Sequence, residues 1–356
     1  MATIRPRRRK DGSIGYTATI RIKRDGRLVY TESQTFSREA MATEWARRRE
    51  VDLEKPGALQ KAKAGDTSLG ALIKRYREEY SALSKWQRSK EADLKKLEGQ
   101  PIAAVNVLEL TAQILIDHVR QRRIEGAGPA TVLNDLVWIG VVLKAAKTAW
   151  SLPVNPEVVR EAREFCWAKK LVGKSRKRDR LPTCEELEQL DRYFAAREGG
   201  RSDIPMRQIM WFAIYSAKRE AEICRIEAED NRPEEMTGLV RDAKHPRHKD
   251  GNHRRFNYTP EAWRIVQLRD MKAGPIFPYN PRTVGSYFTA ACAMLGIEDL
   301  HFHDLRHEAT TRLFERGWGI PQVAAVTLHE SWNELKRYTH IRKRSKVLEA
   351  PFLSGG

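Results

Sequence analysis

The stretch from residue 301 to residue 340, HFHDLRHEATTRLFERGWGIPQVAAVTLHESWNELKRYTH, constrains the fold of this chain more than any other segment. Apolar residues recur every four positions from Leu305, which is the spacing of a helix face, and Gly317 predicts the end of that helix. Pro321 predicts the first turn of a second, shorter helix, and His329 lies just beyond it. The segment therefore predicts two short helices with polar residues at their ends.

His303 and Arg306 lie three residues apart on the first of these helices, so they share one face. A guanidinium offers paired donors to a phosphate and stays charged, and an imidazole adds another donor, so the pair is suited to one small anion. Tyr338 follows nine residues after His329, within reach of the same place. The alternative is structural, because a helix with a surface arginine and a half-buried histidine is common.

A zinc site is a second alternative, because His301, His303 and His307 are close in the sequence. Structural zinc sites usually draw on pairs of cysteines or histidines at fixed ligand spacing. No cysteine pair or second histidine pair lies nearby at that spacing. We therefore predict no metal site here.

The chain is strongly basic, with 65 Lys and Arg against 47 Asp and Glu among 356 residues, a formal net charge of +18. This excess favours a polyanionic partner, nucleic acid before an anionic membrane surface. No run of about 18 apolar residues is present, and the N-terminus lacks the apolar segment of a signal peptide. Four cysteines lie far apart: Cys166, Cys184, Cys224 and Cys292. We expect them to be reduced thiols of a cytoplasmic protein.

Residues 1–63 are predicted to form a small β-hairpin and helix module. Alternating residues on both sides of Asp25-Gly26 predict the hairpin, because an Asp-Gly pair favours a two-residue turn. The cations of the hairpin and of a basic arm before it are Arg5, Arg7, Arg8, Arg9, Lys10, Arg21, Lys23, Arg24 and Arg27. A two-stranded ribbon fits the major groove, so these residues are candidate DNA contacts. The alternative is a solvated, charged hairpin.

Residues 64–168 have the apolar spacing of an all-helical domain. Residues 169–182 are basic and nearly free of apolar side chains, which predicts an exposed linker. Three consecutive cations of this linker are further candidate DNA contacts: Arg176, Lys177 and Arg178. Residues 183–356 are predicted to form a second globular unit of mixed α+β, mainly α, structure.

Arg219 and Glu222 lie at the start of a predicted helix in this second unit. A helix N-terminus attracts anions, which places Arg219 well for a phosphate, although an ordinary surface ion pair explains the same spacing. Further along, two predicted strands flank a polar loop. Lys244 lies where the first strand meets this loop and Lys249 lies deeper in it, so both are candidates to reach into a cleft.

The order of these residues resembles that of the tyrosine recombinase family, the phage-type site-specific integrases, over nearly the whole chain. The matching residues are Arg219, Glu222, Lys244, His303 and Arg306 in an H-x-x-R unit, His329, and Tyr338 in a terminal Tyr-Thr-His. Residues 131–156 and 178–187 also resemble the family's core-binding helix and the entry to its catalytic domain. The resemblance implies an arm-binding module, a helical core-binding domain and a catalytic domain over the three regions described above.

The resemblance also implies a role for each of these residues. Arg219 and Arg306 would clamp the non-bridging oxygens of the scissile phosphate. His303 and His329 would donate further hydrogen bonds, and His303 is a candidate to carry the tyrosine proton. Glu222 would support the site without reacting.

Tyr338 would attack phosphorus and leave a 3′-phosphotyrosyl bond, while Lys244 would protonate the leaving 5′-oxygen. A phenol with a pKa of about 10 is a weak nucleophile unless its proton is accepted during attack. The charge that gathers on the phosphate oxygens is stabilised by preorganised Arg and His donors. Because the covalent bond conserves energy for rejoining, we predict no metal, ATP or other cofactor.

Two departures from the family pattern remove a glycine. Ser216-Ala217-Lys218 stands where the family usually has Thr-Gly-Leu, and Thr327-Leu328-His329 stands where it usually has Leu-Gly-His. The backbone at both places must therefore reach the same conformation with less freedom. The loop over residues 243–255 is also longer than is usual in the family, which leaves the choice between the two lysines open.

The resemblance predicts a site-specific DNA recombinase that integrates or excises a mobile element. It implies a homotetramer on two DNA duplexes, with a directionality or DNA-bending protein as an additional partner, and no membrane. It also implies a bacterial or phage-encoded protein in the cytoplasm, associated with the nucleoid. The tail after Tyr338 includes the segment RKRSKVLEAPFLSGG. We predict that it packs either on a neighbouring subunit or within its own chain.

Two alternative functions share these residues. A type IB topoisomerase uses the same chemistry but relaxes supercoils without exchanging strands between partners. A DNA-binding regulator with the same fold binds DNA without cutting it. The separate N-terminal module favours recombination over relaxation, and the intact set of reactive residues favours cutting over regulation.

Overall fold

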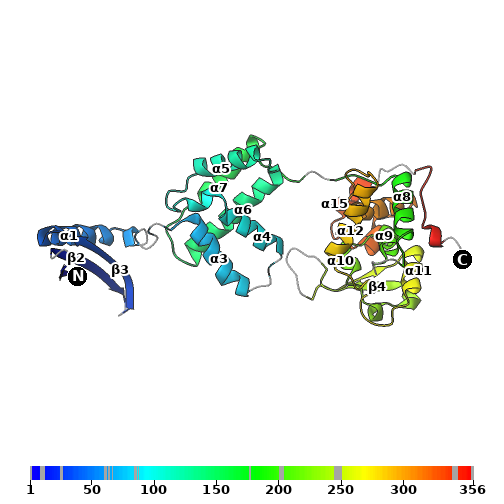
Figure 1. The fold of residues 1–356 in the computed structure, drawn as a ribbon, viewed down its shortest axis with the longest axis horizontal. Helices are drawn as coiled ribbons and strands as arrows, with labels where there is room; N and C mark the ends of the chain where they lie inside the picture. Colours follow the sequence, from blue (N-terminus) through cyan, green and yellow to red (C-terminus); the bar gives the residue numbers. More distant parts are fainter. Residues whose placement is uncertain are drawn as a thin grey trace. The chain divides into compact units, whose positions relative to one another are not determined.

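The computed structural model describes residues 2–8, 13–24, 27–59, 62, 65, 67–83, 86, 88–175, 178–199, 204–243, 251–338 and 344–353. The chain divides into two compact units, residues 1–176 and residues 177–356, whose elements are labelled in Figure 1. Several predicted features lie outside the described residues: the Asp25-Gly26 turn, Arg9, Lys10, Arg176, Lys177, Lys244 and Lys249. The side chains of Arg24 and Arg27 lie outside them too.

The first unit begins with a three-stranded antiparallel sheet in the order β1-β2-β3 and a helix that covers one face of it. These elements are β1 (Thr3–Arg8), β2 (Ile14–Arg24), β3 (Arg27–Phe36) and α1 (Glu39–Glu54). The predicted hairpin is present as β2 and β3. The expectation of a separate basic arm was wrong, because residues 3–8 pair with β2 as a third strand.

The two faces of this sheet differ in chemistry. Ala18 and Ile20 of β2 are buried beneath α1. Ala18 packs with Ala42 and Ala46 of α1, and Ile20 packs in a separate small cluster. Because side chains alternate along a strand, the register defines which residues face away from α1. Among the described strand residues, that outer face carries hydroxyl and cationic side chains, the exposed Leu28 opposite Lys23, and no carboxylate; its polar residues are Thr3, Arg5, Arg7, Thr17, Thr19, Arg21, Lys23, Thr31, Ser33 and Thr35.

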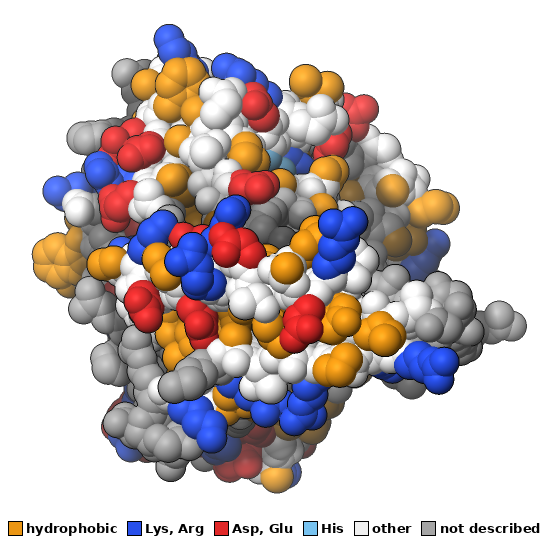
Figure 2. Space-filling model, turned by 90° about the vertical axis from the view of Figure 1, so that its left-hand side faces the viewer, with side chains coloured by type: hydrophobic (Ala, Val, Ile, Leu, Met, Phe, Trp, Pro, Cys, Tyr) orange, Lys and Arg blue, Asp and Glu red, His pale blue; other side chains and the backbone are white. Residues whose placement is uncertain are grey.

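Acidic and basic side chains are mixed on the surface drawn in Figure 2, which is seen from the N-terminal end of Figure 1. The basic excess of the sequence is therefore not one continuous patch on that surface. The absence of carboxylates from the outer face of the N-terminal sheet rests on the strand register of the described residues.

A helical bundle follows in the same unit. Its elements are α3 (Leu69–Leu83), α4 (Arg88–Glu98), the 3-10 turn η1 (Pro101–Ala104), α5 (Ala112–Ile124), α6 (Pro129–Thr148) and α7 (Glu157–Ala168). The Thr111 hydroxyl accepts a hydrogen bond from the Ile114 amide at 3.3 Å and caps α5. The apolar stripe of α6, which includes Val132 and Leu136, is fully buried in this bundle, as the helical spacing of residues 64–168 predicts.

Helix α6 is also long and apolar enough, by length and composition, to cross a membrane. Its polar Asp135 is nevertheless buried within the bundle, where it accepts a hydrogen bond from Arg122 Nε at 3.1 Å. His118 Nε2 lies 3.3 Å from the same carboxylate. The central helix of a bundle therefore accounts for this apolar composition.

The second unit is mainly helical, with one short antiparallel pair of strands, as the sequence predicts. Its elements are α8 (Cys184–Ala195), α9 (Met206–Ser216), α10 (Glu220–Ile223), η2 (Ala228–Asp230), η3 (Pro233–Glu235), β4 (Thr237–Val240), β5 (Arg254–Asn257), α11 (Pro260–Arg269), α12 (Pro281–Met294), α13 (Asp304–Glu315), α14 (Ile320–Thr327), α15 (Trp332–Leu335), η4 (Lys336–Tyr338) and η5 (Pro351–Leu353). Helix α9 is its centre, since Trp211 and Phe212 are fully buried and α8, α11 and α13 pack around them.

The tail over residues 344–353 packs on its own unit, which is one of the two arrangements that the sequence left open for this segment. The Ala350 amide donates to Tyr215 Oη at 2.7 Å, and Arg312 Nη1 donates to the Leu348 carbonyl at 2.8 Å. Leu348 and Phe352 of the tail are partly buried against the core. The described tail is thus intramolecular.

Candidate active site

The second unit contains a cavity of about 270 Å³ that brings together residues from distant parts of the chain. It is lined by Arg219, His303, Arg306, His307, Thr310, His329, Glu334 and Tyr338. Five of the six predicted catalytic residues therefore meet in one place. The sixth, Lys244, lies outside the described residues.

Arg219 stands immediately before α10, and its guanidinium reaches back to Glu222. Arg219 Nη1 donates to Glu222 Oε1 at 2.6 Å, and the Arg219 amide donates to Glu222 Oε2 at 2.9 Å. Glu222 is only 3% exposed and also lies 3.7 Å from the Arg306 guanidinium. The alternative of an ordinary surface ion pair was therefore wrong, because one buried carboxylate aligns two arginines.

Burial alone raises the pKa of Glu222, but the neighbouring cations Arg306, Arg219 and Lys218 lower it below its ordinary value. The carboxylate therefore stays charged and holds the arginines at the cavity. This is the supporting role that the family resemblance implies for Glu222.

Arg306 is the most deeply held cation of the site. Its Nη1 donates to the Ala217 carbonyl at 2.5 Å and its Nη2 donates to the Thr327 carbonyl at 2.8 Å. Burial, followed by the charge of Arg219, lowers its pKa to about 10, so the guanidinium remains charged at neutral pH. These bonds join the ends of α9 and α14 to α13 and fix the guanidinium before any anion arrives.

His329 lies directly beyond α14, as the sequence predicts. Its Nε2 is 3.3 Å from Arg306 Nη2, and its Nδ1 is 2.7 Å from Thr327 Oγ1. Since the guanidinium only donates, this geometry requires the tautomer with the proton on Nδ1. Donation to a phosphate from Nε2 requires the other tautomer, and the Thr327 hydroxyl is able to serve as donor or acceptor to Nδ1.

The pKa values of both site histidines are depressed. Burial and then the charges of Arg306 and Arg219 lower the pKa of His303, and the same causes lower that of His329 to about 3. Both imidazoles are therefore neutral near pH 7. They are suited to hydrogen bonding with a phosphate rather than to charge pairing.

Tyr338 ends the short 3-10 turn η4, and its side chain is only 7% exposed. Its hydroxyl lies 2.5 Å from Nδ1 of His307. The sequence suggested His307 only as a possible zinc ligand, so this contact was not predicted. The available signal was its position on the helix face of His303, four residues along, which places it on the same cavity wall.

The two positions where the family usually has glycine adopt left-handed backbone conformations. Ala217 has φ 55° at the end of α9, and Leu328 has φ 58° at the end of α14. The first supplies the carbonyl that binds Arg306, and the second stands directly before His329. The predicted conformational demand is therefore confirmed, and non-glycine residues meet it here at some cost in strain.

Lys218 is a buried cation beside the site. It is 1% exposed, donates from Nζ to the Val326 carbonyl at the end of α14, and lies 3.8 Å from the centre of the Phe256 ring. Burial lowers its pKa well below the ordinary value. Lys218 thus joins the turn before Arg219 to the turn before His329.

The strands that flank the predicted lysine loop lie next to this site. Strand β5 packs against α14, and Arg254 Nη1 donates to Glu330 Oε1 at 2.8 Å, one residue after His329. The Ala243 amide donates to the Asn252 carbonyl at 2.8 Å and closes the base of the loop. The loop therefore starts beside the cavity, although Lys244 and Lys249 are outside the described residues.

The candidate DNA contacts have different environments. Arg7, Arg21 and Lys23 are on the outer face of the N-terminal sheet, and Arg8 points to the other face. Arg178 instead donates to Asp304 from Nε at 2.6 Å and to Asp299 from Nη1 at 2.8 Å. Asp304 is fully buried at the start of α13, so the described position of Arg178 is an anchor for that helix.

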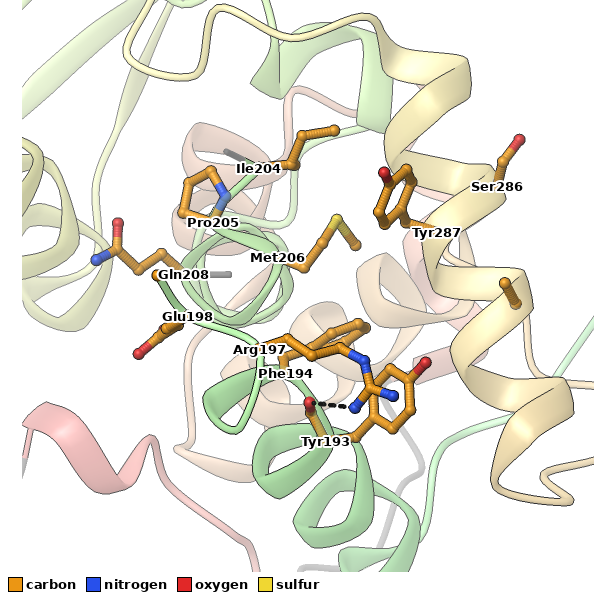
Figure 3. A pocket seen from close by; sticks show the side chains of 12 residues that line it. Tyr193, Phe194, Arg197, Glu198, Ile204, Pro205, Met206, Gln208, Ser286 and Tyr287 are labelled. Carbon is orange, nitrogen blue, oxygen red and sulfur yellow. Dashed lines mark hydrogen bonds between the residues drawn. The ribbon is translucent and has the colours of Figure 1, made fainter. Parts of the chain in front are cut away.

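A larger hollow of about 730 Å³ lies elsewhere in the second unit. Figure 3 shows Tyr193, Phe194, Met206 and Tyr287 around it, with Arg197 donating to the Tyr193 carbonyl at 3.2 Å. Its lining contains no histidine, cysteine or lysine. Cavity volume alone therefore does not identify the candidate active site. The smaller cavity is the candidate, because the predicted catalytic residues line it.

In the part of the chain that the structure describes, no group of three or more His, Cys, Asp or Glu side chains is arranged to hold a metal ion. The three histidines of the zinc alternative accordingly do not form a ligand cluster. His303 and His307 instead lie with their rings perpendicular and 5.2 Å apart between centres.

Comparison with known proteins defines the class first. Residues 184–345 match the phage integrase family. A Tn1549 transposon integrase in complex with circular intermediate DNA superimposes with a TM-score of 0.59 at 12% identity, over 77% of this chain and 96% of that one. A lambda integrase tetramer bound to a Holliday junction gives a TM-score of 0.58 at 17% identity, over 92% of this chain and 95% of that one. These two structures establish the fold.

A sequence relative narrows the class. The shufflon-specific DNA recombinase of Escherichia coli is 31% identical over 255 residues, which are 68% of this chain. The match spans 61% of that recombinase's length. These matches show that residues 184–345 belong to the phage integrase family.

Proposed function

We propose that this protein is a site-specific DNA recombinase that cuts and rejoins DNA through a 3′-phosphotyrosyl intermediate. One observation carries the proposal: the Tyr338 hydroxyl opens on the same 270 Å³ cavity as Arg219, Arg306, His303 and His329. A nucleophile and four donors to an anion around one small space are what attack on a phosphodiester requires.

The chemistry follows from these positions. The guanidiniums of Arg219 and Arg306 and the neutral imidazoles of His303 and His329 surround the place where a scissile phosphate would sit. The two guanidiniums are held by protein contacts before DNA binds, so they need little reorganisation as charge builds on the phosphate oxygens, whereas His329 must change tautomer to donate from Nε2. Tyr338 Oη would bond to phosphorus and the 5′-oxygen would leave, with Lys244 or Lys249 as the candidate acid.

The outer face of the N-terminal sheet is the surface we propose for contact with additional DNA sites. Its cations and hydroxyls are able to bind phosphates and base edges, and its lack of carboxylates among described residues avoids repulsion. A double variant Arg21→Ala and Lys23→Ala should weaken DNA binding and reduce the salt slope by about 2, one for each lost phosphate contact. The matched control is Arg47→Ala with Arg48→Ala, two exposed cations on α1.

The larger assembly is proposed from the class of protein. We infer a homotetramer on two duplexes, acting in the cytoplasm of a bacterium on the DNA of a mobile element, with integration or excision as the outcome. The structural neighbour whose tetramer is bound to a Holliday junction supports this assembly. A directionality or DNA-bending protein is a further proposed partner.

A covalent trap tests the proposed function. The protein is incubated with nicked duplexes from the DNA that flanks its gene, denatured in SDS, and examined for a band shifted by the attached strand. Wild type should form this adduct in the presence of a chelator, and Tyr338→Phe should form none while still binding DNA. Salt-sensitive binding without any adduct would favour a non-cutting regulator, and supercoil relaxation without joint products would favour a type IB topoisomerase.

A further inference from the structure

His307 is a reactive side chain in the cavity to which the catalytic scheme above assigns no role. Its Nδ1 lies 2.5 Å from Tyr338 Oη, at the short end of hydrogen-bond distances. In one arrangement the phenol donates its proton to the imidazole, and in the other the imidazole donates to the phenol oxygen. Only the first arrangement prepares the phenol for attack.

The helix places His307 between the phosphate donors and the nucleophile. It follows Arg306 directly on α13 and stands one turn after His303, on the wall of the same cavity. Its ring is inclined by 26° to the Tyr338 ring, with 6.3 Å between centres. Phe314, two turns further along α13, lies parallel to Tyr338 at 6.0 Å. One helix therefore orients the phenol at both its ring and its hydroxyl.

The charges of the cavity indicate when a proton is transferred. Arg219 and Arg306 line the cavity, and their positive charges, partly offset by Glu222 and Glu334, disfavour a further positive charge there. A bound phosphodiester brings a negative charge into the cavity and offsets this field. Proton transfer to an imidazole is therefore favoured only when DNA is in place, which protects the free enzyme from forming a reactive phenolate.

We propose that His307 accepts the phenolic proton of Tyr338 during strand cleavage and returns it during rejoining. This inference rests on the proposed function. In cleavage the Oη–P bond forms, the P–O5′ bond breaks, the phenolic proton moves to His307 Nδ1, and a separate acid protonates the 5′-oxygen. In rejoining the 5′-hydroxyl attacks phosphorus and gives its proton back to the base left by that separate acid, the P–Oη bond breaks, and the imidazolium returns the proton to Oη. His303 is then left to bind the phosphate.

Two variants separate proton transfer from simple positioning. His307→Ala removes the contact, whereas His307→Gln retains a hydrogen-bond acceptor that does not take up a proton near pH 7. Both should bind the nicked duplex like wild type but form the covalent adduct about 10²–10³ times more slowly. Added imidazole should partly restore His307→Ala and not His307→Gln. A His307→Gln rate close to that of wild type would overturn proton transfer, because the hydrogen bond alone would suffice.

A second experiment uses a substrate whose reaction does not involve the proton of Tyr338. In a Tyr338→Phe background, a DNA strand ending in 3′-p-nitrophenyl phosphate is joined to a 5′-hydroxyl, and the departing p-nitrophenolate needs no proton. Adding His307→Ala should now cost less than about threefold, instead of the loss seen in cleavage. An equal loss in both reactions would overturn the inference, since His307 would then support the phosphate donors.

The outcomes also separate this inference from the function on which it rests. No adduct from wild type on any flanking DNA would overturn both. A wild-type adduct with unaffected His307 variants would overturn the inference alone and leave the recombinase proposal standing.

Discussion

The two sides of the cavity are built in different ways. On the phosphate side, Arg306 is tied to two backbone carbonyls and to a buried carboxylate, which links α13 with the ends of α9 and α14 and with α10. On the nucleophile side, the Tyr338 hydroxyl contacts His307, and its ring contacts His307 and Phe314, all on α13. Donors that stabilise a transition state gain from being fixed beforehand, whereas a nucleophile must approach its target.

Removal of the central guanidinium should have the largest effect. Arg306→Gln should slow adduct formation by about 10²–10³-fold, because a preorganised donor is lost. It should also lower the free energy of unfolding by about 3 kcal/mol, because Glu222 and two carbonyls lose a buried partner. Single-turnover trapping and urea unfolding measure the two effects.

Arg219→Gln is the matched control, because this side chain is 37% exposed. It should cost a similar factor in rate but at most about 1 kcal/mol in stability. Equal losses of stability in the two variants would contradict the distinction between a deeply anchored arginine and a partly open one.

The next largest effect is expected at the start of α13, where Arg178 binds Asp304. Arg178→Ala leaves the fully buried Asp304 without its charged partner, so the free energy of unfolding should fall by about 3 kcal/mol. The salt dependence of DNA binding should not change. Lys174→Ala, at an exposed linker position, is the control for loss of one positive charge. A normal stability with a salt slope reduced by about 1 would instead make Arg178 a phosphate contact.

His329 should make the stability of the phosphate side depend on pH. Burial and the charges of Arg306, Arg219 and Lys218 lower its pKa to about 3 in the folded protein, against an unfolded value near 6.5. The unfolded chain therefore binds more protons between these values, and stability is lost as the pH falls below 6.5.

The comparison of wild type with His329→Gln isolates this contribution. Between pH 7 and pH 5, wild type should lose about 2 kcal/mol more of its free energy of unfolding than the variant. Urea titrations at pH 7, 6 and 5 measure the difference, and carboxylates common to both proteins cancel in it. Parallel curves would show that the imidazole takes up a proton in the folded protein as easily as in the unfolded chain.

The smallest effect is expected at the left-handed turn that presents the carbonyl to Arg306. Ala217→Gly relieves about 1 kcal/mol of backbone strain but removes a fully buried methyl group of similar value, so stability should change by less than about 1 kcal/mol. Ala217→Val, which adds branching at φ 55°, should destabilise by about 2 kcal/mol. Thermal unfolding of the pair checks this, and a stable Val variant would show that the turn relaxes.

Much of the local structure was predictable because it depends on neighbours in the sequence. Thr111 caps α5, Gly317 follows α13 and Pro321 opens α14, as the spacing of apolar and punctuating residues indicated. The two replaced glycines correctly marked left-handed positions. The strand β1 was missed, since its pairing with β2 depends on register rather than on composition.

The sequence by itself determined which reactive groups exist, their order, and the helix face that His303 shares with Arg306. Only the tertiary structure decided which of them meet. Tyr338 reaches His307 across 31 residues and two intervening helices, α14 and α15, and Lys218 reaches a carbonyl 108 residues away. Backbone conformation responds to adjacent residues, whereas the partner of a buried charge or hydroxyl is set by how distant segments pack.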